Sequence, residues 1–546
     1  MRWGALAALA AIVVLWLGFL GLRALYFPDE GRYAEIPREM LASGDFVTPR
    51  LNGFPYFEKP PLQYWLTAAT FAVLGEGEFT ARVAPALAGL AAALAVLLTV
   101  RRIAGRRSGW MAGAMMAGSI GFFLSAQFVT LDMLLSALLA AALCAFLLAQ
   151  HARVTAAEQR QWMRVAWALC ALAVLTKGLI GLVLPMLAVG VYVVVARDWA
   201  LLRRLEIGAG IVIVLLITAP WFVLVGTRNP GFAEFFFIHE HWQRFTQPGH
   251  RRTGPLLYFV PIAIGYLSPW LPALVAALVR GRARAAGSRT FSPSLFGWCW
   301  AGAIFVFFSV SSSKLPAYVM PALAGAAVAG GVALAAHWSR SVRITAWTII
   351  LLGITVAAFA VPAADAIKVE LVQERYEGSV GWMLAAGAVL VVAGALALAA
   401  LRARRRVPAL AVLVVGVLAA CQAGLVVAYE VDAYFSAKRV LAPVTNGVRP
   451  FRPELPFYSV DLFDQTVPFY LGRTVILVKE KSEVEWGIAR APANYIEDVA
   501  TFAQRWRDGG DGYAVMRTST YEFLKATALP MRVVGEDGRR VVVARF

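Results

Sequence analysis

Long apolar runs alternate with short polar connections along most of the chain. Each run is about 20 residues of mainly Leu, Ala, Val, Ile and Phe, which is enough for a helix to cross a hydrocarbon core about 30 Å thick. The pattern predicts about thirteen membrane-spanning helices, at residues 4–27, 81–100, 109–127, 131–150, 163–176, 179–196, 207–226, 256–279, 293–310, 315–336, 344–364, 380–401 and 408–429.

The first run, residues 4–27, also stands where a secretory signal peptide would. It is longer than the usual apolar core of such peptides, and no small-x-small cleavage site precedes Asp29. We therefore expect a retained span. Only the letters TKG separate the runs 163–176 and 179–196, which predicts a tight hairpin at Lys177.

Basic residues mark every second connection between these runs. Counting Arg2, these connections hold about 21 arginines and very few acids. Short loops rich in Arg and Lys face the cytoplasm, so the alternation supports the span count and places the other connections outside. Composition agrees, with 60 % hydrophobic and 15 % charged residues. The net charge of +18 is then mainly a topology signal that also suits contact with membrane lipids, and we expect no nucleic-acid partner.

The chain divides into a membrane domain, residues 1–430, and a tail, residues 431–546. Within the first part, the outer loops 28–80 and 227–255 are long enough to carry function. In the tail, short β-type runs such as "TVILVK" alternate with helical patterns, which predicts a small α/β domain on the outer face. We expect this domain to act mainly as a structural cap.

The first outer loop opens with the unusually charged stretch "DEGRYAEIPREM". We expect a helix here with Asp29 near its positive end, and with Ile36, Met40 and Leu41 forming an apolar edge in the membrane interface. Most of the acids in this loop are expected to be solvated headgroup anchors. Asp29 is the exception, because an acid at membrane depth is costly and usually functional. Residues 61–75 predict a second interfacial helix.

The rule that basic loops face the cytoplasm does not call for Lys or Arg on the outer side, yet the outer loops contain several. A cluster of Lys and Arg beside the outer leaflet suits a phosphorylated lipid. The cations are Arg32, Arg38, Lys59, Arg244, Arg251, Arg252 and Lys314. Asp132, Lys177 and Tyr318 lie at predicted outer span ends, so the pattern predicts a cavity with two acids and several cations. Each lysine taken alone also fits a snorkelling anchor.

The stretch "PDEGRYAEIPREMLASGDFVTPRLNGFPYFEKPPLQYW" resembles the first outer loop of bacterial 4-amino-4-deoxy-L-arabinose lipid A transferases. These are GT-C-fold glycosyltransferases, related to protein O-mannosyltransferases. The pieces "TLDML", "LTKGL", "FIHEHWQRF", "HRRTGPLLYFVP" and "SSSKLPAYVMP" follow in the family's order. The resemblance implies a polytopic α-helical membrane protein with a C-terminal periplasmic α/β domain.

The resemblance also implies a reaction. The donor would be undecaprenyl phosphate carrying aminoarabinose, and the acceptor a phosphate of lipid A. Transfer would occur at the periplasmic face of the bacterial inner membrane, and the less negative lipid A would bind polymyxin-type peptides weakly. We expect no nucleotide cofactor, since no nucleotide fingerprint is present, and we expect a monomer.

Roles for the candidate residues follow from this chemistry. Lys59 and Arg244 are predicted to clamp the leaving phosphate. Asp29 is the carboxylate that the family implies is catalytic, and its role as a base or as a positioning group stays open, because an acceptor phosphate is already largely ionised. Further candidates are Asp132 as a second carboxylate, and Arg32, Lys177, Lys314, Tyr33, Tyr56 and Tyr318 for the phosphate, sugar or prenyl chain.

A divalent metal, zinc or similar, is a further expectation of the resemblance. Glu58 with His239, or with His241 as the alternative, offers ligand atoms that zinc accepts. A purely structural role for these histidines remains open, because no His-x₃-His helical pair is present. Two other functions also remain open: transfer of another sugar from a polyprenyl phosphate, and lipid or sugar transport. A transporter would be expected to show internal repeats and midplane polar sites.

Overall fold

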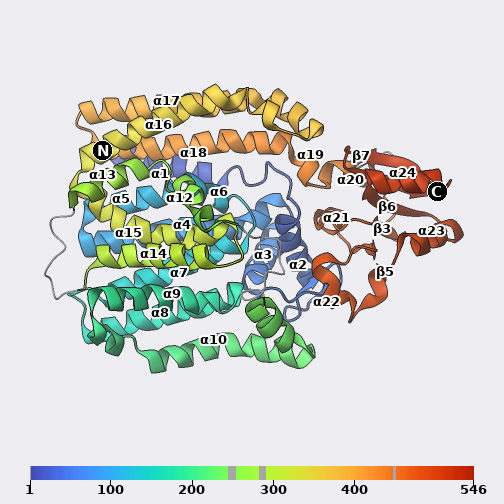
Figure 1. Cartoon of the computed structure of the whole chain (residues 1–546), viewed down its shortest axis with the longest axis horizontal. Helices are drawn as coiled ribbons and strands as arrows, with labels where there is room; N and C mark the ends of the chain where they lie inside the picture. The colour runs from blue at the N-terminus through green and yellow to red at the C-terminus, as the bar shows by residue number, and fades with distance from the viewer. Residues whose placement is uncertain (1, 244–253, 282–290, 447–450, 546) are drawn as a thin grey trace.

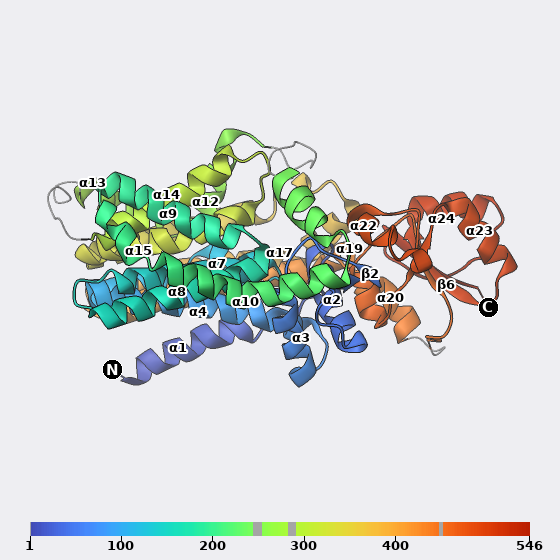
Figure 2. The same ribbon diagram turned by 90° about the horizontal axis from the view of Figure 1, so that it is seen from below.

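The computed structural model describes residues 2–243, 254–281, 291–446 and 451–545. Long helices lie side by side in a bundle, and an α/β domain stands at one end of it (Figure 1). The first outer loop, with helices α2 (Asp29–Ser43) and α3 (Leu62–Leu74), lies between the bundle and that domain. A view turned by 90° shows the same order along the long axis (Figure 2). The molecule is therefore a helical membrane domain with a separate layer at one end.

The bundle helices coincide broadly with the predicted apolar runs. They are α1 (Arg2–Leu17), α4 (Glu78–Ala104), α5 (Arg106–Ala117), α6 (Ile120–Ala126), α7 (Leu131–Ala149), α8 (Ala156–Lys177), α9 (Ile180–Ala196), α10 (Ile207–Arg228), η3 (Leu256–Tyr258), α12 (Phe259–Leu267), α13 (Leu271–Gly281), α14 (Pro293–Val310), η4 (Pro316–Val319), α15 (Met320–Ala336), α16 (Trp338–Ala360), α17 (Glu370–Arg402) and α18 (Arg406–Glu430). Among the described residues, eight helices are long and apolar enough to cross a membrane, or ten if each of two bent pairs is one span. The chain is thus a multi-pass membrane protein, and the count of thirteen spans stays a prediction.

Two of the predicted straight spans are sharply bent. Helices α5 and α6 meet at 59°, and the helical segment ending at Leu267 meets α13 at 101°. In the second case Ser268 is extended, with ψ 137°, and Pro269 follows it. A residue before proline avoids the helical region and proline itself has no N–H, so the helix stops there.

The first predicted span, residues 4–27, is only partly helical. Helix α1 ends at Leu17, and no helix covers residues 18–28. Arg82 of α4 explains how this irregular backbone is satisfied: its Nη1 donates to the carbonyls of Leu20 at 2.7 Å and Arg23 at 2.6 Å, and its Nη2 to Ala24 at 2.8 Å. One buried guanidinium thereby replaces the hydrogen bonds that a helix would have made.

Glu30, at the start of α2 (Asp29–Ser43), completes this arrangement. Its carboxylate lies 2.7 Å from Arg82 Nε and 2.7 Å from Arg23 Nη1, and it accepts from the backbone N–H groups of Tyr26 and Val129, each at 3.1 Å. Burial alone would raise the pKa of Glu30, but the two guanidinium groups outweigh it and lower the pKa to about 2. The expectation that this acid is a solvated anchor is therefore wrong. Glu35 and Glu39 are also buried.

Helix α2 packs against the C-terminal domain rather than against lipid. Ile36 and Met40 are fully buried in one hydrophobic cluster with residues of that domain, so the prediction of a membrane-facing edge is wrong. A Cβ on Gly31 would lie 2.7 Å from the backbone nitrogen of Thr466. Only glycine permits this close approach between α2 and helix α21 (Thr466–Leu471). The predicted second helix of the loop is present as α3 (Leu62–Leu74).

A six-stranded sheet forms the centre of the C-terminal domain. The strand order is β5-β4-β3-β6-β8-β7, with β3, β4, β5 and β6 parallel and with β8 antiparallel to both β6 and β7. Its elements are β3 (Phe457–Val460), β4 (Ile476–Val478), β5 (Tyr495–Ile496), α23 (Val499–Asp508), β6 (Gly512–Arg517), α24 (Thr518–Ala526), β7 (Arg532–Glu536) and β8 (Arg540–Arg545).

The two faces of this sheet belong to different cores. Side chains alternate along a strand, so Val542 and Ala544 of β8 join the cluster with α2, whereas Val541 and Val543 join the cluster under α23 and α24. A strand buried on both faces reads as a continuous apolar run, which is what "RRVVVARF" shows. The sheet therefore connects the first outer loop to the helices at the far end of the molecule.

Replacing Glu30 by Gln is expected to destabilise the protein strongly, because it leaves two buried guanidinium groups without their carboxylate. Removal of one partner of a buried ion pair typically costs about 3–5 kcal/mol. Thermal unfolding of the detergent-solubilised protein should show a clearly lower midpoint for Glu30→Gln. The exposed Glu76 offers a matched control, and Glu76→Gln should leave the midpoint nearly unchanged.

The pH dependence of unfolding gives a second measure of the same group. Folding lowers the pKa of Glu30 from 4.5 to about 2, so its stabilising effect is complete above about pH 4.5 and is lost as the pH falls towards 2. The free-energy difference between wild type and Glu30→Gln should therefore shrink over that window. A difference that stays constant from pH 6 to pH 2.5 would show that Glu30 is not an ion-paired carboxylate.

Candidate functional site

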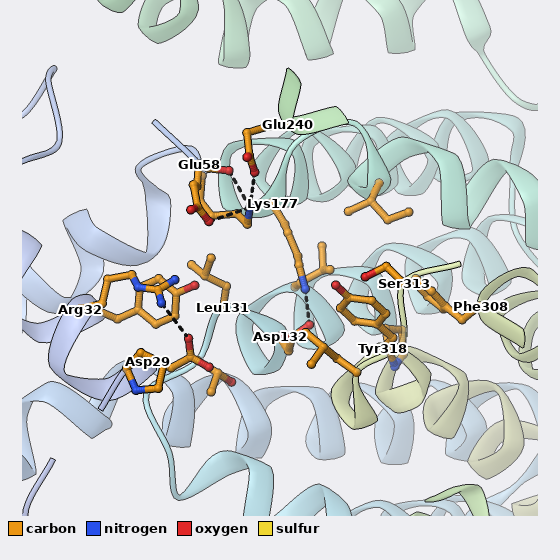
Figure 3. A pocket seen from close by; sticks show the side chains of 18 of the residues that line it. Asp29, Arg32, Glu58, Leu131, Asp132, Lys177, Glu240, Phe308, Ser313 and Tyr318 are labelled. Carbon is orange, nitrogen blue, oxygen red and sulfur yellow. Dashed lines mark hydrogen bonds and ion pairs between the residues drawn. The ribbon is translucent and has the colours of Figure 1, made fainter. Parts of the chain in front are cut away.

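A cavity of about 640 Å³ lies where the bundle, the first outer loop and the C-terminal domain meet. Figure 3 shows charged side chains from several elements pointing into it. The residues that line it are Pro28, Asp29, Arg32, Tyr33, Glu58, Lys59, Thr130, Leu131, Asp132, Leu135, Lys177, Ile180, Leu184, Glu240, Phe307, Phe308, Ser311, Ser313, Leu315, Tyr318, Pro321, Gln465 and Glu483. The cavity thus brings together eight of the residues singled out from sequence.

Helix ends place three of the charged groups. Asp29 is the first residue of α2 and Asp132 the second residue of α7, so both carboxylates lie at positive helix termini. Lys177 is the last residue of α8, at a negative terminus. Lys177 donates a hydrogen bond to Asp132, and its ammonium lies 4.8 Å from the centre of the Tyr318 ring. The predicted hairpin therefore brings a lysine to the second acid.

Asp29 differs from its neighbours in being open to the cavity. Its side chain is 56 % exposed, and its Oδ1 lies 3.6 Å from Arg32 Nη2. The same nitrogen of Arg32 lies 2.6 Å from Glu483 of the C-terminal domain, and Arg32 Nη1 donates to the hydroxyl of Tyr56 at 3.1 Å. Glu483 and Tyr56 thus hold the guanidinium of Arg32. The carboxylate of Asp29 stays exposed at the cavity.

Lys59 lies on another wall of the cavity. Its Nζ donates to the backbone carbonyl of Glu58 at 2.7 Å and lies 3.5 Å from the carboxylate of Glu240. Glu240 belongs to η2 (Glu234–Gln243), the π-helix that follows α10. The prolines around Lys59 in "YFEKPP" keep this segment extended, which presents the ammonium to the cavity.

Some predicted site residues lie elsewhere. Tyr56 is buried behind Arg32 and does not line the cavity. Lys314 is also buried, where its Nζ donates to the carbonyl of Ser309 at 2.7 Å and faces the ring of Phe259. Arg244 and the side chain of His241 lie outside the described residues.

Glu240, Gln465 and Glu483 line the cavity but were missed from sequence. Gln465 and Glu483 come from the tail, whose short strands predicted a cap, and no motif marks either residue. Burial raises the pKa of the Glu483 carboxyl, and the neighbouring carboxylates of Glu58 and Asp29 raise it further, against the opposing effect of Arg32. The tail is therefore more than a cap, because it supplies part of the wall.

A second cavity of about 530 Å³ adjoins the first and shares Glu58, Glu240 and Glu483 with it. His239 lines this second space, with a half-exposed side chain stacked on Phe235 at 5.2 Å between ring centres. Among the described residues, no three His, Cys, Asp or Glu side chains are grouped to hold a metal ion. The described residues thus do not by themselves fit the expected zinc centre, which stays a prediction.

Comparison with known proteins connects both parts of the chain to sugar transferases. The family model of the aminoarabinose transferase C-terminal domain matches residues 445–545, and that of dolichyl-phosphate-mannose-protein mannosyltransferase matches residues 1–236. A curated relative from Shewanella sediminis is named undecaprenyl phosphate-alpha-4-amino-4-deoxy-L-arabinose arabinosyl transferase. It is 34 % identical over 327 residues, which are 58 % of this chain. The matched stretch spans only 57 % of that relative's length.

Solved structures extend the likeness over the whole chain. The crystal structure of ArnT from Cupriavidus metallidurans bound to undecaprenyl phosphate is 37 % identical, with a TM-score of 0.92 over 99 % of this chain and 97 % of that one. The oligosaccharyltransferase of Archaeoglobus fulgidus shares the fold alone, with a TM-score of 0.50, 14 % identity, and coverage of 95 % of this chain and 71 % of that one. The chain therefore belongs to the family of bacterial 4-amino-4-deoxy-L-arabinose transferases, membrane proteins of the GT-C fold.

Proposed function

We propose that this protein transfers 4-amino-4-deoxy-L-arabinose from undecaprenyl phosphate to a phosphate of lipid A. The reaction takes place at the periplasmic face of the bacterial inner membrane. The observation that carries this proposal is the cavity in which Asp29, Lys59 and Lys177 meet. It lies at the helix ends, in a chain 37 % identical to a transferase crystallised with undecaprenyl phosphate.

The position of the cavity suits a lipid-linked donor. Helix α7 begins and helix α8 ends at the cavity, and the apolar side chains of Leu135, Leu184 and Phe308 form part of its wall. A prenyl chain can therefore stay beside apolar surface while its phosphate reaches the charged groups. The C-terminal domain contributes Gln465 and Glu483 to the cavity wall.

The chemistry requires one bond to break and one to form. The bond between the anomeric carbon and the phosphate oxygen of the donor breaks, and its electron pair stays on undecaprenyl phosphate. A phosphate oxygen of lipid A forms the new bond to the same carbon. Lys59 and Lys177 stabilise the negative charge that develops on the leaving phosphate, as preorganised donors do in other group transfers.

Asp29 acts on the sugar that is transferred, and not on the phosphate of the acceptor. An acceptor phosphate is largely ionised at neutral pH, since its second pKa is about 6, so it needs little help from a base. The exposed carboxylate instead orients the sugar and stabilises the positive charge that appears at the anomeric carbon. Arg32 at 3.6 Å keeps that carboxylate in place.

The product explains a biological consequence of the reaction. An added aminosugar makes lipid A less negative, and cationic peptides such as polymyxin bind it less strongly because they lose ionic contacts. Cells that carry this activity are expected to resist such peptides.

Replacement of Asp29 by Asn should abolish the modification of lipid A. The variant keeps the size of the side chain but loses its charge, and loss of one group that stabilises the transition state electrostatically lowers rates by about 10²–10³-fold. Mass spectrometry of lipid A from cells without their own transferase should show an added aminopentose with the wild-type chain and none with Asp29→Asn. The exposed Asp365 offers a control, and Asp365→Asn should modify lipid A normally.

Unmodified lipid A from cells that contain the folded wild-type chain and the donor would contradict the proposed sugar. A different added mass would identify another polyprenyl-linked sugar. Normal modification by Asp29→Asn would show that transfer does not need the charge of Asp29.

Replacement of Lys59 by Met should slow transfer while the protein remains folded. The side chain keeps its length but no longer stabilises the leaving phosphate, and loss of one such donor lowers turnover by about 10²–10³-fold. Steady-state kinetics on purified protein measure this effect, with Lys368→Met at an exposed position as the control. Equal turnover of Lys59→Met and wild type would exclude Lys59 from the phosphate site.

A further inference from the structure

Gln465 has an unused hydrogen-bonding group at the wall of the main cavity. The residue is 4 % exposed and lines the cavity, and its Oε1 has no hydrogen-bond partner. Its Nε2 donates to Glu483 Oε1 at 2.6 Å. A buried polar atom without a partner is costly, so an unpaired oxygen beside a substrate cavity suggests a ligand that donates hydrogen bonds.

The orientation of this amide is fixed by its neighbour. Glu483 Oε2 is ion-paired with Arg32 at 2.6 Å, and an ionised carboxylate only accepts hydrogen bonds, so the amide nitrogen of Gln465 faces Glu483 and its oxygen faces away. The oxygen is then an acceptor held in place by the same carboxylate. Gln465 precedes α21, the helix that packs against Gly31 of α2, so its backbone is also held firmly.

Negative charge is in excess around this oxygen. Glu483 and Asp29 both approach Nη2 of Arg32, at 2.6 Å and 3.6 Å, so a single guanidinium serves two carboxylates. Asp132 and Glu240 have lysines of their own, Lys177 and Lys59. Two carboxylates that share one guanidinium leave a negative excess on this side, which favours a ligand with a positive group.

We propose that Gln465 and Glu483 of the C-terminal domain, together with Asp29, form the subsite that binds the charged amine of the donor sugar. This inference rests on the proposed function and deepens it. An ammonium group offers three N–H donors, and an amide oxygen with two carboxylates provides three acceptors for it. The C-terminal domain thus helps to select an aminosugar over a neutral sugar.

The chemistry of the subsite distinguishes sugars by charge. A neutral sugar with a hydroxyl in place of the amine would make weaker hydrogen bonds to the same oxygens. A uronic acid would place a second negative charge beside Asp29 and Glu483, which is unfavourable. Lys59 and Lys177 bind the leaving phosphate, whereas the carboxylates of Glu483 and Asp29 bind the amine. The negative and the positive end of the donor each meet groups of the opposite charge.

The test compares two donors with the purified full-length protein. One donor is undecaprenyl phosphate carrying 4-amino-4-deoxy-L-arabinose, and the other carries L-arabinose, which has a hydroxyl at the same position. Wild type should prefer the amino donor in kcat/KM by about tenfold or more, because charge-assisted hydrogen bonds are about twice as strong as neutral ones. Gln465→Met removes the acceptor at nearly constant size and should reduce this preference by about tenfold.

Gln63 provides a closely matched control. It is also a fully buried glutamine whose Oε1 has no hydrogen-bond partner and whose Nε2 is bonded, in this case to Thr67, but it lies in α3 and does not line the cavity. Gln63→Met should keep the donor preference of wild type. Glu483→Gln, which removes the charge alone, gives a second independent variant, and binding of undecaprenyl phosphate without a sugar checks that each variant is folded.

The outcomes separate the subsite from the proposed function. A wild-type enzyme that uses both donors equally, or a Gln465→Met variant that slows both donors by the same factor, would overturn the subsite and leave the transferase activity standing. If Gln465→Met does not bind undecaprenyl phosphate, Glu483→Gln takes its place in the test. A Glu483→Gln variant with the donor preference of wild type would then overturn the subsite. Transfer of neither sugar by wild type would overturn the proposed function and the subsite with it.

Discussion

The geometry of the cavity depends on one buried carboxylate. Glu30 receives the guanidinium groups of Arg82 and Arg23 and two backbone N–H groups, and so joins α2, α4 and the irregular segment between α1 and α2. Its neighbour Asp29 is displaced by about 100° around the helix. With Glu30 fixed inside the protein, Asp29 is fixed in the cavity. The buried carboxylate of Glu30, which needs its ion pairs to be stable, thus determines where the exposed carboxylate of Asp29 points.

The C-terminal domain packs against the first outer loop of the membrane domain. One face of its sheet shares a hydrophobic core with Ile36 and Met40 of α2, and Gly31 allows α21 to approach the same helix. This contact places Gln465 and Glu483 at the wall of the cavity beside Arg32. The domain, α2 and the cavity therefore behave as one packed unit, in which the tail has both a structural and a binding role.

Pairs of opposite charge line the cavity. Lys177 pairs with Asp132, Lys59 with Glu240, and Arg32 with Glu483. In the proposed reaction the donor brings a phosphate and an amine, so it offers each cation and each carboxylate a new partner. Exchange of existing ion pairs for pairs with the substrate avoids exposing an isolated charge, which is costly in such an enclosed space.

Sequence alone determined the parts of the protein that depend on local pattern. Apolar runs revealed the membrane helices, short β-type runs revealed the strands of the tail, and Asp29, Lys59, Asp132 and Lys177 were recognisable from their motifs. Only the tertiary structure decided that Glu30 is buried, that Ile36 faces protein rather than lipid, and that Glu483 meets Arg32. These facts depend on contacts between segments up to about 450 residues apart, and no local periodicity records which distant partner a side chain will meet.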